Sequence, residues 1–230
     1  MEQIEPRFFQ KHPLVKDLLS LAAFVLVIVL GTMFLNTFIY RSYNVVGESM
    51  ENTLHGDDRV VVNRAAVSWA HLMGQEYIPE RGQVIVFTHE DEGTVKEYKE
   101  AGVKNPMTCA APNNITDQYI IKRVIAFPGE RVTVKDEIMT IYNDEHPDGF
   151  VYDNEWRKSE TDGPKEKTAG EVDMIVPEGE LFVSGDNRES TSSGYYYSWD
   201  SRNGLGTIPY CRIIGPVVLR LFPLDKIRTF

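Results

Sequence analysis

An uncharged apolar run near the N-terminus constrains this chain more than any other feature. Residues 18–40 contain no charged side chain over 23 positions, and only four Ser, Thr or Asn residues interrupt the run. A helix of this length spans about 34 Å, which is enough to cross a hydrocarbon core of about 30 Å. A cleaved leader would have a shorter apolar core and a small-x-small cleavage site, and residues 38–41 offer none. We expect one transmembrane helix at residues 18–40, with Tyr40 and Arg41 as interfacial anchors.

The remainder of the chain is acidic. The formal net charge is −10, and residues 1–17 carry three basic and three acidic groups, so the whole surplus lies in residues 41–230. This balance argues against a nucleic-acid partner, which would select a basic surface. The sequence predicts a short cytoplasmic N-terminus at residues 1–17, the span, and one domain at residues 41–230. The positive-inside rule favours this orientation only by a thin margin, because Arg41 and Arg59 closely follow the span.

Residues 41–230 have the pattern of a mostly β domain. Segments rich in Val, Ile and Phe recur between turn signals, at 59–63, 83–87, 119–127, 131–134, 180–183 and 213–221. The best candidate for a short helix is 65–72. Two polar stretches, 88–118 and 142–172, are expected to be surface loops or hairpins outside the sheet.

Three segments hold residues that could carry chemistry. Ser49 follows the span closely, although a serine in a loop is common and is most often inert. Lys122 lies in the apolar strand 119–127, where alternation gives both Lys122 and Arg123 apolar neighbours and cannot decide which side chain faces the core. The chemistry does discriminate, because burial can lower the pKa of a lysine from about 10.4 far enough to make it a general base, whereas arginine stays charged.

The third segment joins residues 185–188 (Gly-Asp-Asn-Arg) to residues 198–202 (Ser-Trp-Asp-Ser-Arg), after the strand at 180–183. Opposite charges with hydroxyls between them suit a hydrogen-bonded loop that braces a site. A solvated polar turn explains the same residues. Spacing does not decide whether Cys109 and Cys211 pair. The five histidines are scattered without ligand spacing, so the sequence supports no metal site.

Taken in order, these segments resemble the bacterial type I signal peptidases. The order is an anchor, a Ser-Met box at 49–50, a strand ending in Phe87, a Lys-Arg-Val-Ile box at 122–125 with Pro-Gly at 128–129, and the Gly-Asp-Asn-Arg and Ser-x-Asp-Ser-Arg boxes. The resemblance runs from the anchor to the C-terminus, although the two polar stretches carry little of it. It implies a signal-peptidase-like β-barrel or β-sheet catalytic domain without a cofactor.

The resemblance also implies residue roles. Ser49 would be the nucleophile and Lys122 the general base of a Ser–Lys dyad that works through an acyl-enzyme, with the Ser49 backbone N–H as an oxyanion donor. Ser198 aligns with a serine that orients the lysine amine. Asp200 and Arg202 align with a pair that supports this arrangement.

The implied substrates are secreted precursors with small residues at P1 and P3. Val45, Met50, Ile120 and Ile121 match pocket-lining positions, although each could be plain core. The implied location is the plasma membrane of a bacterium, crossed once by a monomer whose catalytic domain lies on the extracytoplasmic side.

Two positions depart from the family pattern. Some members have a serine two residues before the nucleophile that adds an oxyanion donor, and this chain has Gly47, as other members do. The second donor is therefore undefined. Asn52 replaces the usual proline, which frees the backbone and predicts altered loop rigidity rather than lost activity.

Four alternatives compete with this interpretation. A related self-cleaving repressor would need a DNA-binding module where this chain has an anchor. The endoplasmic-reticulum branch uses His in place of the lysine. An inactive membrane-tethered pilus or assembly factor of the same fold would lack Ser49 or Lys122, and both are present. A non-enzymatic β-rich binding domain leaves the order of the boxes unexplained.

Overall fold

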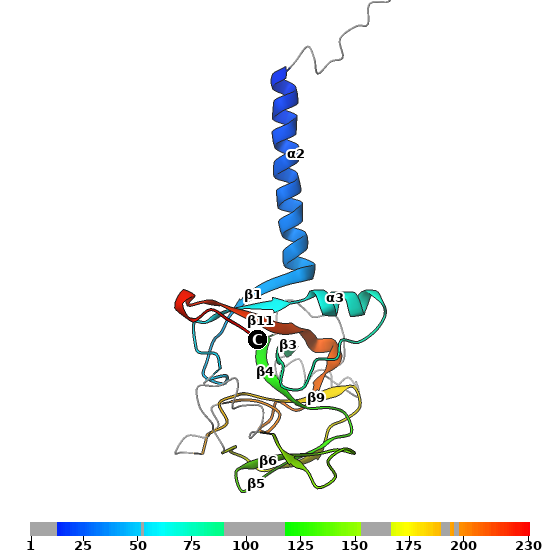
Figure 1. The fold of residues 1–230 in the computed structure, drawn as a ribbon, viewed down its shortest axis with the longest axis vertical. Coiled ribbons are helices and arrows are strands. Elements are labelled where there is room, and N and C mark those ends of the chain that lie inside the picture. The colour runs from blue at the N-terminus through cyan, green and yellow to red at the C-terminus, as the bar shows by residue number, and fades with distance from the viewer. Residues whose placement is uncertain (1–12, 52, 90–117, 153–166, 190–193, 196–197) are drawn as a thin grey trace, which may run out of the picture.

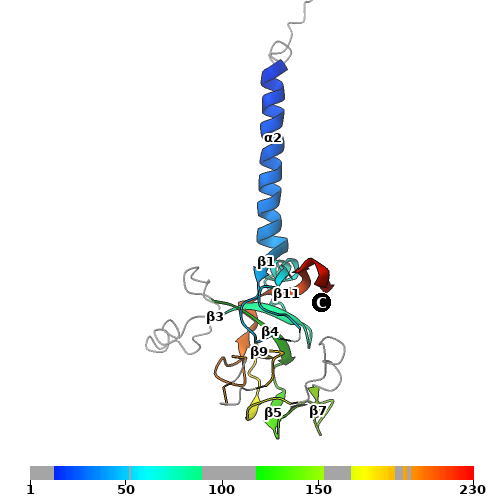
Figure 2. The ribbon, with the colours of Figure 1, turned by 90° about the vertical axis from the view of Figure 1, so that its left-hand side faces the viewer.

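A computed structural model describes residues 13–51, 53–89, 118–152, 167–189, 194–195 and 198–230. Its N-terminal apolar segment forms a helix that extends away from a β-rich domain (Figures 1 and 2). Helix α2 spans Pro13–Phe34 and continues into a π-helical turn, η1, at Leu35–Ile39. This stretch is long and apolar enough to cross a membrane. Helical structure begins before the predicted position 18 because the uncharged run marks the part suited to hydrocarbon, whereas the charged residues ahead of it can still be helical.

The larger sheet has eight strands, and the three segments that hold the candidate chemical residues lie on its strands or directly beside them. Strand β1 (Tyr40–Asn44) starts directly at the end of η1. The order along the sheet is β1, β2 (Arg59–Asn63), β11 (Ile213–Phe222), β3 (Val84–His89), β4 (Gln118–Ala126), β9 (Glu180–Ser184) and β10 (Ile208–Pro209), and β12 (Arg228–Thr229) pairs with β11. All of these pairs are antiparallel.

A smaller sheet lies at the end of the domain farthest from α2 (Figure 1). Its strand order is β7 (Phe150–Val151), β6 (Ile138–Tyr142), β5 (Arg131–Lys135) and β8 (Val172–Ile175), again antiparallel. The described part of the predicted polar stretch 142–172 therefore contributes strand residues as well as loops. Residues 153–166 lie outside the described part, as does most of the stretch 88–118, whose ends belong to β3 and β4.

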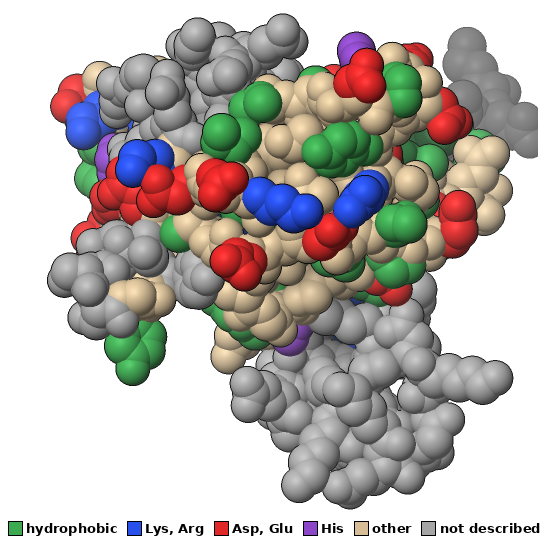
Figure 3. Space-filling model, turned by 90° about the horizontal axis from the view of Figure 1, so that it is seen from below, with side chains coloured by type: hydrophobic (Ala, Val, Ile, Leu, Met, Phe, Trp, Pro, Cys, Tyr) green, Lys and Arg blue, Asp and Glu red, His purple; other side chains and the backbone are tan. Residues whose placement is uncertain are grey.

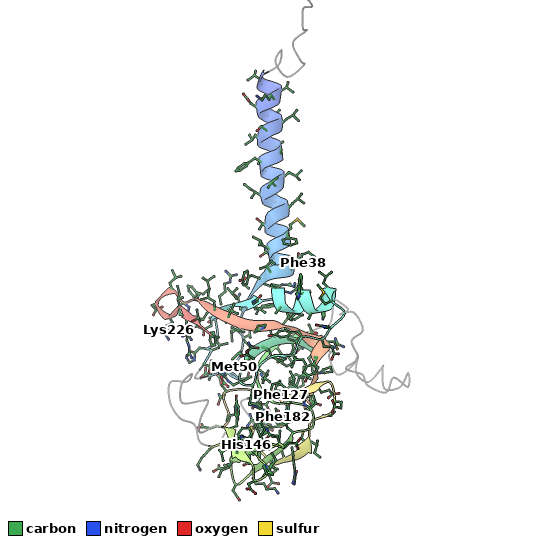
Figure 4. All side chains as sticks on the ribbon, turned by 45° about the vertical axis from the view of Figure 1, so that its right-hand side comes forward. Phe38, Met50, Phe127, His146, Phe182 and Lys226 are labelled. Carbon is green, nitrogen blue, oxygen red and sulfur yellow. The ribbon has the colours of Figure 1, made fainter. Side chains whose placement is uncertain are left out.

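From Lys122 to Ala126, strand β4 is buried on both of its faces, because this part lies where the hydrophobic clusters meet. Val124 packs in one cluster with residues of β3 and β9. The next residue, Ile125, packs in a second cluster with the small sheet and Phe182. A third cluster holds Met50 with Val60 and Val62 of β2 beneath the turn that follows β1. Figure 4 shows Met50 nearer to α2 and Phe182 nearer to the small sheet.

The predicted mostly β class is confirmed, and helix α3 covers Ala65–Leu72 as predicted. The six predicted strands all form, with ends shifted by at most two residues. Strands β1, β6, β7, β8, β10 and β12 were not predicted. β1 overlaps the end of the run assigned to the membrane at Tyr40. β7, β10 and β12 have two residues each, which is too short for alternation to show, and β6 and β8 border charged stretches.

Candidate active site

Ser49 lies in the tight turn between β1 and β2. Gly47 enters this turn with a φ of 86°, a left-handed value that glycine adopts without strain. Leu54 N donates to Met50 O at 2.8 Å, and both of these side chains are buried in the core below the turn. The turn is therefore held from beneath, and the Ser49 side chain stays half-buried at its surface.

Lys122 reaches the same point from β4. Its Nζ lies 2.7 Å from Ser49 Oγ and 3.1 Å from Ile121 O, and the residue is only 3% exposed. Burial lowers the pKa of Lys122 to about 8, against the opposing effect of the Asp200 and Asp186 carboxylates. The predicted pairing of a loop serine with a buried lysine is thus present in the geometry.

Arg123, the next residue, is buried as well and makes a separate ion pair. Its Nε and Nη2 contact the two carboxylate oxygens of Asp186 at 2.8 and 2.6 Å, and Thr53 Oγ1 donates to the same carboxylate. Burial alone would raise the pKa of Asp186, but the charge and hydrogen bonds of Arg123 with the Thr53 hydroxyl hold it at about 2. The pair ties β4 to the turn that carries Ser49.

Asp200 accepts several hydrogen bonds from donors of the third segment. Its Oδ2 accepts from Ser198 Oγ at 2.7 Å, from Gly185 N at 2.9 Å and from Arg202 Nη2 at 2.8 Å. Although burial opposes ionisation, the charge of Arg202 and these hydrogen bonds lower the pKa of Asp200. The predicted Asp200–Arg202 support is therefore an ion pair. Ser198 is bonded to Asp200, and no Ser198–Lys122 hydrogen bond occurs among the described residues.

Two residues that the sequence did not single out by role complete the site. Gly185 lies so close to the nucleophile turn that a Cβ there would overlap Ser49 O and Ser198 Oγ. Asn187 N donates to Ser49 O at 3.1 Å, and its Nδ2 donates to Glu48 O at 3.0 Å. The Gly-Asp-Asn-Arg segment is thus a buried brace for the nucleophile turn, and the solvated-turn reading of it is wrong.

A cavity of about 340 Å³ opens beside Ser49 and Lys122. Three of the four predicted pocket residues line it: Val45, Ile120 and Ile121. The turn instead directs Met50 inward to the core, where it is 1% exposed. Aromatic side chains complete the wall: Tyr43, Tyr119 and Trp199.

One edge of β4 is open beside this cavity. β4 pairs with β3 from Gln118 to Arg123, but with β9 only from Arg123 to Ala126. Residues 118–122 consequently have no strand on their second side among the described elements. An extended chain could add to this edge.

The described residues contain no group of three or more His, Cys, Asp or Glu arranged to hold a metal ion. Cys211 is disulfide-bonded. Cys109 lies outside the described residues, as does Asn52.

Comparison with known proteins gives the same family that the order of the motifs predicts. A family model described as "Signal peptidase, peptidase S26" matches residues 18–222. The chain therefore belongs to the S26 family of serine peptidases, within its bacterial type I signal peptidases, as the sequence motifs predict.

Several relatives extend over nearly the whole chain. A signal peptidase I of Bacillus amyloliquefaciens is 30% identical over 90% of this chain and 88% of its own length. Signal peptidase I S of Bacillus subtilis (strain 168) is 27% identical over 93% and 94%, and signal peptidase IB of Staphylococcus aureus (strain N315) is 27% identical over 95% and 94%. A solved signal peptidase I from Enterococcus faecalis V583 matches with a TM-score of 0.35 at 21% identity, covering 62% of this chain and 98% of that one.

Proposed function

We propose that this chain is a membrane-anchored endopeptidase that removes signal peptides from secreted precursors, with Ser49 as nucleophile and Lys122 as general base. The observation that carries the proposal is the 2.7 Å contact between Lys122 Nζ and Ser49 Oγ at the wall of a cavity. Lysine is a usable base only when neutral. With a pKa of about 8, roughly one Lys122 in ten is neutral at pH 7, compared with fewer than one in a thousand for an exposed lysine.

In the proposed reaction Lys122 transfers one proton in each of the two steps, acylation and deacylation. The neutral Lys122 amine accepts the Ser49 hydroxyl proton as Oγ attacks the scissile carbonyl carbon. The ammonium then gives this proton to the leaving nitrogen, so that the C–N bond breaks and an ester to Ser49 remains. Water attacks the ester, Lys122 takes a proton from that water and passes it to Ser49 Oγ as the ester C–O bond breaks. The signal peptide leaves as a carboxylic acid, which loses its proton to solvent.

The Ser49 backbone N–H supplies an oxyanion donor in this proposal. It donates to no atom of the described residues, while the carbonyl of the same residue is held by Asn187 N. A fixed, unoccupied donor of this kind stabilises the charge that develops on the carbonyl oxygen. Gly47 has no side chain to add a second donor.

The open edge of β4 supports an extended substrate. A precursor segment pairing with residues 118–121 would pass the cavity walls formed by Val45, Ile120 and Ile121. Alternate side chains of an extended peptide point to the same face, so P1 and P3 would both enter the cavity. Shallow apolar walls of this kind favour small residues.

The anchor supports the proposed location. Helix α2 with η1 would cross the bacterial plasma membrane once, with residues 1–17 in the cytoplasm and a monomeric catalytic domain outside. An inactive assembly factor of the same fold is not favoured, because Ser49 and Lys122 are both present and in contact.

Substrate specificity tests this function directly. A purified precursor with Ala at P1 and P3 is expected to be cut once, after P1, as read by mass spectrometry of the new N-terminus. Replacing P1 by Leu should lower kcat/KM by about 100-fold or more, because the added side chain overfills the pocket and displaces the scissile carbonyl. A matched precursor with Leu at P2 should be cut normally. Equal cleavage of the P1 and P2 variants would contradict the pocket.

The pH dependence follows from Lys122. Because burial depresses the pKa of this base to about 8, the active, neutral form is gained as pH rises through 8. The proposed kcat/KM therefore falls about tenfold per pH unit below 8 and is level above it. The measurement is a pH–rate profile of the full chain in detergent, with circular dichroism as a control for folding. A limb that appears only above pH 10 would mean that Lys122 is not the base.

A further inference from the structure

We infer that Arg41 and Arg64, at the foot of the membrane helix, form a binding site for the phosphate of an anionic phospholipid. The inference rests on the proposed membrane insertion of α2. It concerns a hollow of about 520 Å³ that shares no lining residue with the active-site cavity and is lined by Asn36, Thr37, Arg41, Ser42 and Arg64. Every one of these side chains can donate a hydrogen bond, and none is a carboxylate.

The local charge is opposite to that of the chain as a whole. The full chain has a formal net charge of −10, yet residues 35–47 and 59–75 together contain three arginines and no Asp or Glu. No ion pair joins Arg41 or Arg64 to a carboxylate of the described residues. Two guanidinium groups that pair with no carboxylate in the described part of the chain suit a phosphodiester, which accepts their paired N–H groups.

The hollow also lies at the right depth. Arg64 N donates to Ile39 O at 2.7 Å, and Ile39 is the last residue of η1. Arg41 lies two residues farther along, with its guanidinium 5.4 Å from the Tyr43 ring centroid. When the apolar helix fills the hydrocarbon core, residues at its end lie in the headgroup layer, which is about 5–7 Å thick on each side.

Helix α3 provides independent support that this edge faces lipid. Figure 1 shows α3 beside the foot of α2, and Ser68 Oγ donates to Phe38 O at 3.0 Å. Trp69 and Leu72, one turn apart on α3, are 63% and 74% exposed. Exposed Trp beside a membrane helix is typical of the interface.

The opposite end of the domain offers a matched control. Seen from below, it shows Lys and Arg side chains interspersed with Asp and Glu (Figure 3). There, Arg131 pairs with Asp173 at 2.7 Å, and Lys135 lies 3.8 Å from the same residue. The variant Arg131→Gln/Lys135→Gln removes two positive charges far from α2, as Arg41→Gln/Arg64→Gln does at its foot.

The test is native mass spectrometry of the full chain in neutral detergent, titrated with phosphatidylglycerol or phosphatidylcholine. All variants carry Ser49→Ala, so that cleavage plays no part. We expect the protein with Arg41 and Arg64 intact to bind phosphatidylglycerol more tightly than phosphatidylcholine. The foot variant should lose about 30-fold in phosphatidylglycerol affinity, and the control should lose none. If the double variant does not fold, Arg64→Gln alone decides, with an expected loss of about fivefold.

Three results would overturn the site. They are equal losses in both double variants, equal binding of the two lipids to the wild type, and displacement of phosphatidylglycerol by inorganic phosphate, which would mark a site for the free anion. A failure of the dyad is seen separately, as retained peptidase activity in Ser49→Ala, and leaves this titration unaffected.

Discussion

Replacing Ser49 by Ala or Lys122 by Met is expected to lower precursor cleavage by about 10⁴-fold or more. The first change removes the attacking oxygen, and the second removes the base that lies 2.7 Å from it. Lys122→Arg should fail equally, because a guanidinium stays protonated and cannot accept the serine proton. The measurement is single-turnover cleavage of a precursor by the full chain in detergent. Substantial activity in any of the three variants would eliminate the dyad.

The thermal stability of each variant distinguishes a loss of catalysis from a loss of the fold in this experiment. A buried lysine whose pKa falls to about 8 on folding destabilises the fold below pH 8, and this cost disappears as pH rises from 8 toward the unfolded value of 10.5. At pH 7 the cost amounts to about 3 kcal/mol. Lys122→Met should therefore melt at a higher temperature than the wild type at pH 7, with the difference shrinking by pH 10. An inactive variant with a raised melting temperature cannot owe its inactivity to unfolding.

Asp186→Asn is expected to destabilise the domain by about 3–5 kcal/mol, because it removes the carboxylate charge that pairs with the buried guanidinium of Arg123. Arg123 is 1% exposed and Asp186 is 0% exposed, so water cannot replace the lost partner. The measurement is chemical or thermal unfolding of the full chain at neutral pH. Arg131→Gln is the control, since its ion pair with Asp173 is exposed and should contribute less than about 1 kcal/mol.

The pair also predicts a consequence for catalysis. Thr53 Oγ1 donates to Asp186 and the neighbouring Asn187 N donates to Ser49 O, so movement of this segment would displace the nucleophile turn. Activity of Asp186→Asn should therefore fall even at temperatures where the variant is folded, mainly in kcat. A variant as stable as Arg131→Gln would show that the buried pair is not needed.

The sheet was predictable wherever strands are buried on both faces or end in clear turns. RVVVN at 59–63 and QVIVF at 83–87 are nearly continuous apolar runs, and both are strands. β6 (IMTIY) and β8 (VDMI) are short strands without a clear polar–apolar alternation, and both border charged stretches. β6 follows β5 through a turn at Asp136 and Glu137 with left-handed backbone angles that the residue types did not reveal. β8 pairs with β5 across the intervening residues 136–171, and no local pattern reports that pairing.

The site was predictable as a set of segments but not as a geometry. Alternation could not choose between Lys122 and Arg123, and the structure buries both because β4 has clusters on each face. A buried arginine needs an acidic partner, and this requirement was the one signal in the sequence that could have pointed to Asp186. The contact of Asn187 with Ser49 and the bond from Gly185 to Asp200 depend on loops that meet only after folding. For the same reason, nothing local showed that Met50 points inward.

The junction between helix and domain has a mechanical consequence. η1 passes into β1 without an intervening residue, and hydrogen bonds from Arg64 and Ser68 to the last helical carbonyls lock the two parts together. Such a junction prevents the helix and the domain from rotating relative to each other. In a bilayer this junction would fix the height of Ser49 above the lipid. The enzyme would then select scissile bonds by their distance from the membrane as well as by their sequence.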